Sequence, residues 1–106
     1  MKDLGALMKQ AQAMQEKLQA VQARLAETEA EGVAGAGMVK LALKGSGALV
    51  RIDIDPQLLA PTEAEVLADL IIAAHADAKK KLDAAQGEAM KAIAGPFAGM
   101  PGFPGL

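Results

Sequence analysis

Few side chains in this sequence could act as catalysts. His75 is the only histidine, Ser46 the only serine, Thr28 and Thr62 the only threonines, and cysteine is absent. Ser46 lies in a Gly-Ser-Gly segment, which is typical of a turn and lacks the spacing of a nucleophile elbow. His75 lies among alanines in a helical stretch, where a packed or solvated histidine is the ordinary interpretation. We therefore expect a protein that is not an enzyme and has no catalytic residue.

Paired acidic side chains are the next candidates for chemistry. Asp53 and Asp55 alternate along a predicted strand and therefore share one of its faces. They could hold a cation weakly, or they form the polar face of a sheet and a turn cap. A metal site needs more ligands than two. Gly35 and Gly37 precede no Lys-Ser/Thr pair, unlike a phosphate-binding loop. We expect no metal and no cofactor.

Basic side chains remain as candidates for binding. The formal net charge is -2, but residues 1–26 and 78–91 each carry more cations than anions, whereas residues 61–77 carry only anions. The lysine run at 79–81 covers most of a helical turn. Such a run is either a solvated helix face or a binding surface. Lys40, Lys44 and Arg51 on the predicted sheet form a rival basic surface.

The absence of aromatic side chains restricts the kind of nucleic acid. The chain has no Trp and no Tyr, and its two phenylalanines, Phe97 and Phe103, lie among the last ten residues. Without aromatic rings the folded part cannot stack on unpaired bases, which disfavours single-stranded nucleic acid. Lysine and arginine can hold the phosphates of duplex DNA. With few arginines and an acidic chain, we expect weak and largely non-specific contact.

A predicted hairpin is central to the elements that position these residues. Apolar and polar residues alternate over 39–44 and over 50–54, on either side of the Gly-Ser-Gly turn. A two-residue loop at Ser46 and Gly47 keeps all apolar residues on one face. The pairs it predicts are Leu43 with Val50, Leu41 with Ile52, Val39 with Ile54, and Lys40 with Asp53. Residues 29–34 predict a further strand, which completes a three-stranded antiparallel sheet.

Two long helices flank this sheet in the sequence. Apolar residues over 4–26 follow alternating spacings of three and four, which is a heptad seam. This helix packs on its own sheet, on a helical partner, or on both. A second helix is expected from Pro61 to about residue 94, with Thr62 as N-cap and Glu65 completing a capping box. This helix would be about 50 Å long, whereas the strands limit the sheet that it covers to a length of about 20 Å. Its second half must therefore project or meet another chain, and Gly87 is a weak point.

Composition sets the domain boundaries and the compartment. We expect one domain over residues 1–94 and a flexible Gly/Pro-rich tail over residues 95–106. No apolar run approaches the length of a membrane span, and the first residues lack a signal-peptide core. The absence of cysteine suits a reducing compartment. We therefore expect a cytoplasmic protein with no membrane partner.

Several segments, in this order and spacing, resemble one family across essentially the whole chain. They are Met-Lys-Gln-Ala-Gln-Ala-Met-Gln at 8–15, Gly-Met-Val-Lys at 37–40, Gly-Ser-Gly at 45–47, Ile-Asp-Ile-Asp-Pro at 52–56, the helix at 65–77 with its Asp-Leu-Ile-Ile-Ala-Ala-His core, and the Gly/Pro/Met-rich tail. The chain resembles the YbaB/EbfC family of bacterial nucleoid-associated proteins.

This resemblance implies an α+β subunit in which a helix, a three-stranded antiparallel sheet and a long helix follow one another. It implies a tight homodimer with projecting helices that binds duplex DNA in the nucleoid and affects gene expression indirectly. Charge then selects the DNA-contacting residues on these helices: Lys9, Lys17, Arg24, Lys79, Lys80 and Lys81. The alternative is a protein–protein adaptor for a recombination or repair partner, which would use the helix seam and the tail and bind DNA incidentally.

Overall fold

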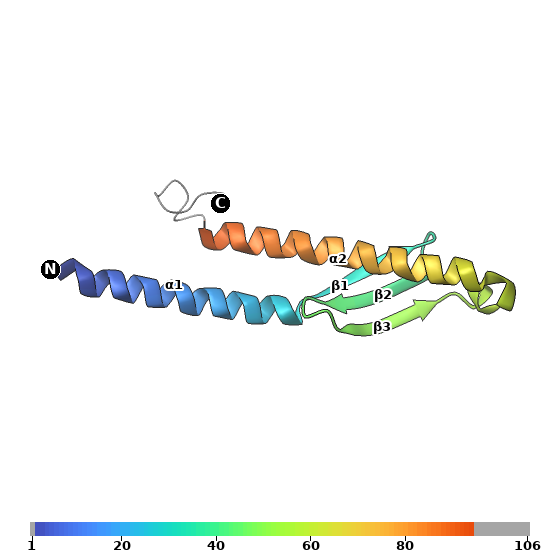
Figure 1. Cartoon of the computed structure of the whole chain (residues 1–106), viewed down its shortest axis with the longest axis horizontal. Helices are drawn as coiled ribbons and strands as arrows, with labels where there is room; N and C mark the ends of the chain where they lie inside the picture. The colour runs from blue at the N-terminus through green and yellow to red at the C-terminus, as the bar shows by residue number, and fades with distance from the viewer. Residues whose placement is uncertain (1, 95–106) are drawn as a thin grey trace.

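The protein has an elongated α+β fold, seen in a computed structural model that describes residues 2–94 (Figure 1). Its elements are α1 (Lys2–Glu27), β1 (Glu29–Ala34), β2 (Val39–Lys44), β3 (Leu49–Ile54) and α2 (Ala64–Ala94). Short 3-10 helices at Pro56–Leu59 and Pro61–Glu63 connect β3 to α2. The molecule measures 74 × 22 × 15 Å because both helices extend beyond the sheet. Neither of these helices is long and apolar enough to cross a membrane.

The three strands form an antiparallel sheet in the order β1-β2-β3. β1 has the bounds that the sequence predicts, and the turn after it uses positive φ angles at Gly35 and Gly37. Most of the predicted register between β2 and β3 is confirmed. Val39 lies opposite Ile54, Leu41 opposite Ile52, and Lys40 opposite Asp53.

The register next to the β2–β3 turn differs from the prediction. Leu43 lies opposite Leu49 and not opposite Val50, because a β-bulge shifts the register between Ala42 and Leu43. The loop is longer than two residues: the Lys44 amide donates to the Ala48 carbonyl at 2.9 Å. The alternation of apolar and polar residues predicts which face of the sheet each side chain occupies. A β-bulge near a turn adds one residue to one strand, so the pairing shifts there while the residues beyond it keep their predicted faces.

The core lies between α2 and the first two strands. Val39, Leu41 and Leu43 of β2 are buried against Ala74 and Ala78 of α2. Small side chains on α2 allow its backbone to approach β1 so closely that a Cβ at Gly32 would overlap the Ala74 carbonyl. α2 therefore covers β1 and β2 and leaves the same face of β3 open, with Leu49 54% and Ile52 37% exposed.

The start of α2 also differs from the prediction. The α-helix begins at Ala64, and the expected N-cap Thr62 lies inside the preceding 3-10 helix. That 3-10 turn has Pro61 at its first position and Ala60 as its cap residue, without a side-chain cap hydrogen bond. α2 then continues without a break through Gly87. The expected turn cap at Asp55 is confirmed, since its carboxylate accepts the Gln57 amide at 2.8 Å.

The two helices run antiparallel and side by side beyond the sheet (Figure 1). Val21 of α1 and Ile93 of α2 are buried and line the same groove, so part of the α1 seam packs on α2. Further toward its N-terminus, α1 leaves Leu4 57% and Leu7 59% exposed. The tail expected at residues 95–106 lies outside the described residues.

Gly32 should tolerate no side chain, whereas Gly87 should. A Cβ at Gly32 would overlap the Ala74 carbonyl and lie 2.8 Å from the Ala78 Cβ, so Gly32→Ala should lower the free energy of unfolding by about 1–3 kcal/mol. Gly87 has open space around it, and Gly87→Ala should raise that free energy by about 0.5–1 kcal/mol. Urea unfolding followed by circular dichroism measures both. Equal effects of the two substitutions would contradict the close approach of α2 to β1.

Candidate nucleic-acid interface

The basic side chains of α1 are available for binding. Lys9, Lys17 and Arg24 are all exposed, and within residues 2–94 none of the three has an ion-pair partner. Lys17 and Arg24 are seven residues apart, which places them on one flank of the helix. Both line a groove of about 400 Å³ between α1 and α2, together with Val21 and Ile93. This flank therefore combines two unpaired cations with an apolar groove floor.

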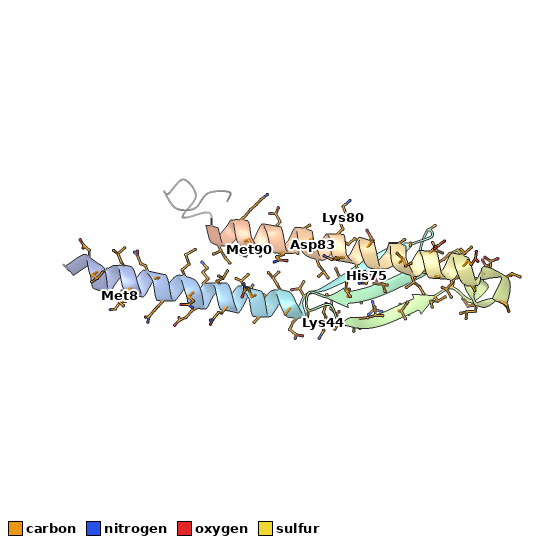
Figure 2. The ribbon with its side chains drawn as sticks, viewed as in Figure 1. Met8, Lys44, His75, Lys80, Asp83 and Met90 are labelled. Carbon is orange, nitrogen blue, oxygen red and sulfur yellow. The ribbon has the colours of Figure 1, made fainter. Side chains whose placement is uncertain are left out.

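The lysine run at 79–81 does not form a single basic patch. Successive residues in an α-helix point about 100° apart, so the three side chains meet different surroundings. Lys79 pairs with Asp83 at 3.2 Å, on the side of α2 that faces the β2–β3 turn. Lys81 pairs with Asp77 at 3.1 Å. Lys80 extends away from the sheet (Figure 2), and among the described residues it has no ion-pair partner.

Two of the three cations on the rival basic surface of the sheet, Lys44 and Arg51, are paired with nearby carboxylates. Lys44 donates to Glu27 at 2.8 Å, and this hydrogen bond raises the pKa of Lys44 and lowers the pKa of Glu27. Arg51 lies 3.3 Å from Asp53 and 3.7 Å from Glu31. An incoming phosphate would have to compete with these carboxylates. The polar face of the sheet is therefore a less suitable anion-binding surface than α1.

Asp77 has a structural role that sequence analysis missed. Its carboxylate accepts the Val33 backbone amide at 3.0 Å, which ties α2 to β1. This hydrogen bond is the main cause of a lowered pKa of Asp77, and the hydrogen bond from Lys81 adds to the effect. The sequence signal was the spacing of Asp77 and Lys81, which is four residues and allows a pair on one helix face. The strand partner could not be read from that spacing.

His75 lies beside Lys79 in a small hollow near the β2–β3 turn.

Within the described part of the chain, no group of three or more His, Cys, Asp or Glu residues could hold a metal ion. Asp53 is engaged by Arg51, and Asp55 by the Gln57 amide. The candidate anion-binding groups are therefore Lys9, Lys17, Arg24 and Lys80, which have no ion-pair partner within residues 2–94.

Asp77→Asn should remove an acid-dependent part of the stability. Because folding lowers the pKa of Asp77, the ionised carboxylate stabilises the folded state at neutral pH. This stabilisation is lost as the pH falls through the folded-state pKa. Wild-type protein should lose stability relative to Asp77→Asn as the pH falls below the ordinary aspartate pKa and then through the lowered folded-state pKa. Urea midpoints followed by circular dichroism across this range test the prediction. A constant difference between the two proteins would contradict the role of the Asp77 charge.

Comparison with known proteins finds a solved structure with a similar fold and relatives with a similar sequence. The crystal structure of the uncharacterized protein HP0035 from Helicobacter pylori has a TM-score of 0.67 and 22% identity, covering 88% of this chain and 95% of that one. A nucleoid-associated protein of Phenylobacterium zucineum is 66% identical over 100% of this chain and 99% of its own length. One from Caulobacter vibrioides is 64% identical over 100% and 98%. The family model for YbaB/EbfC DNA-binding proteins matches residues 1–97, and the chain therefore belongs to the YbaB/EbfC DNA-binding family.

Proposed function

We propose that this protein binds duplex DNA as a homodimer in the bacterial nucleoid, mainly through phosphate contacts. Membership of a DNA-binding family and close relatives named as nucleoid-associated proteins support this function. The single observation that carries it is the set of exposed α1 cations without carboxylate partners in the described structure. Unpaired cations can neutralise DNA phosphates and release counterions, which drives binding without sequence readout.

The proposed contact surface is the flank of α1 with Lys9, Lys17 and Arg24, extended by Lys80 on α2. Lys79 and Lys81 complete the set that charge alone selects, but each already lies close to a carboxylate. Exposed ion pairs contribute little energy, so Lys79 could leave Asp83 for a phosphate. Lys81 also donates to a backbone carbonyl, and its exchange would cost a second hydrogen bond. We therefore rank α1 and Lys80 first.

A homodimer explains the open face of β3. Leu49, Val50 and Ile52 expose apolar surface on an edge strand, and exposed strand edges invite pairing with another chain. A second copy would remove this surface from water and leave both helix pairs projecting. Two sets of α1 cations could then contact one duplex. Effects on nucleoid organisation and gene expression would follow indirectly, because phosphate contacts carry no sequence information.

A protein–protein adaptor is the second candidate. The observation that favours it is the apolar seam near the N-terminus of α1, where Leu4, Leu7 and Met8 are exposed. Such a seam on a projecting helix fits a partner helix. In this alternative, DNA binding would be incidental. The DNA-binding experiment below discriminates, because an adaptor needs no salt-sensitive binding to a labelled duplex.

Removing the α1 cations should weaken DNA binding more than removing the same charge elsewhere. We expect Lys9→Ala/Lys17→Ala/Arg24→Ala to raise Kd at least about tenfold and to flatten the salt dependence by about 0.9 in log–log slope per lost phosphate contact. The measurement is fluorescence anisotropy of a dye-labelled duplex at several salt concentrations.

The matched control for this experiment is Lys40→Ala/Lys44→Ala/Arg51→Ala on the sheet, which changes the net charge equally. It should change Kd less, because Lys44 and Arg51 already pair with carboxylates. Equal losses in both variants would overturn the α1 surface. Absence of salt-sensitive binding by the wild type would overturn the DNA-binding proposal and favour the adaptor.

A charge on the open face of β3 should separate the dimer. Ile52→Asp should reduce the mass in solution from twice the chain mass to the chain mass of 10.8 kDa, because a buried unpaired carboxylate is unfavourable at an interface. Size-exclusion chromatography with light scattering measures it. The control is Val66→Asp, which adds the same charge at a side chain that is 46% exposed on α2. Val66 lies about three helical turns before Asp77 and therefore on the side of α2 toward β1, away from the open face of β3. Unchanged mass of Ile52→Asp would contradict an interface at β3.

A further inference from the structure

The two edges of the sheet differ in how their backbone groups are satisfied. At β1, the Val33 amide donates to Asp77 at 3.0 Å, and the Lys81 ammonium donates to the Glu31 carbonyl at 2.7 Å. Asp77 and Lys81 also contact each other at 3.1 Å. Two side chains from successive turns of α2 therefore bind a donor and an acceptor of the same strand.

These two backbone groups are the ones that another strand would use. The Gly45 amide donates to the Thr28 carbonyl at 3.0 Å, so Thr28 directs its backbone toward β2. In an antiparallel ladder this direction alternates along the strand. The backbone groups of Glu31 and Val33 consequently face away from β2, along the outer edge of the sheet. The side chains of Asp77 and Lys81 occupy this edge.

The outer edge of β3 has no such cover. The Asp55 amide donates to the Met38 carbonyl at 2.8 Å, so Asp55 and Asp53 direct their backbone groups toward β2. The alternation places the backbone groups of Ile52 and Ile54 on the outer edge, which no strand or helix of residues 2–94 pairs. α2 packs on β1 and β2, which is why its side chains reach only the first of the two edges.

We propose that Asp77 and Lys81 form an edge clamp that blocks β1 and restricts self-association to β3. This inference rests on the proposed homodimer. Pairing of β3 with β3 of a second copy uses the same surface twice and closes after two subunits. Pairing of β1 with β3 of another copy would be heterologous and could continue into an open filament. The clamp would prevent the second arrangement by occupying the donor and the acceptor that it needs.

Charge strengthens this block. An incoming strand would have to displace a carboxylate and an ammonium from charge-assisted hydrogen bonds, which are stronger than neutral ones. Covering a strand edge with another element is a known means of preventing edge-to-edge aggregation, and here two side chains of α2 cover β1. The clamp therefore acts on the choice of interface, in addition to joining α2 to β1.

The clamp can be tested with two double variants of α2, each of which removes one cation and one anion and leaves the net charge unchanged. Asp77→Ala/Lys81→Ala removes the clamp, and Lys79→Ala/Asp83→Ala removes another pair at the same spacing that does not touch β1. Light scattering after size-exclusion chromatography, over a range of protein concentrations, gives the masses. We expect wild type and control to remain dimers, and the clamp variant to form larger species that grow with concentration.

The outcomes separate the clamp from the homodimer. A wild-type mass of one chain would overturn the homodimer, whereas a clamp variant with the same mass as wild type would overturn the clamp. Adding Ile52→Asp to the clamp variant should abolish the larger species, because β3 supplies their second edge. Larger species that persist with Ile52→Asp would indicate aggregation of unfolded chains and would overturn the proposal. Asp77→Asn keeps an acceptor for the Val33 amide and should remain dimeric.

Discussion

The close packing of α2 on β1 determines most of this structure. Gly32 has no side chain, and Ala74 and Ala78 are small, so the helix backbone lies directly against the strand. The buried side chains Val39 and Leu41 of the neighbouring strand complete the core beneath α2. Because one helix cannot cover three strands at this distance, β3 keeps an open face. The same placement brings Asp77 and Lys81 to the outer edge of β1.

Periodicity predicted the fold well, and local geometry was harder to predict. Burial on one face requires alternation in strands and a spacing of three and four in helices, so the types and order of the elements could be predicted. The alternation pairs Leu43 with Val50, which is wrong because the preferred face of a side chain does not determine the loop length. A β-bulge adds one residue and lets the following side chains keep their faces. Thr62 was expected to cap α2, but the chain enters the helix through a 3-10 turn at Pro61.

Charge could be counted from the sequence, but ion pairing could not. The lysines at 79–81 are adjacent in sequence, and the structure gives them three different environments. Lys81 binds the Glu31 carbonyl, a contact that depends on how α2 crosses the sheet. The α1 cations differ because α1 projects beyond the sheet (Figure 1), and among the described residues Lys9, Lys17 and Arg24 form no ion pair. The DNA-contacting role of all six basic residues remains a prediction.

The acidic net charge is compatible with phosphate binding because the charges are separated along the molecule. Glu63 ends the 3-10 helix before α2, and Glu65 and Asp69 lie near the start of α2. The sheet lies between this end of the molecule and α1 (Figure 1). A strand of six residues spans about 20 Å, and interactions between exposed charges are largely screened beyond about 8 Å at physiological ionic strength. A duplex beside α1 would therefore experience the local cations more than the net charge of the chain. The elongated shape thus separates a basic end from an acidic end.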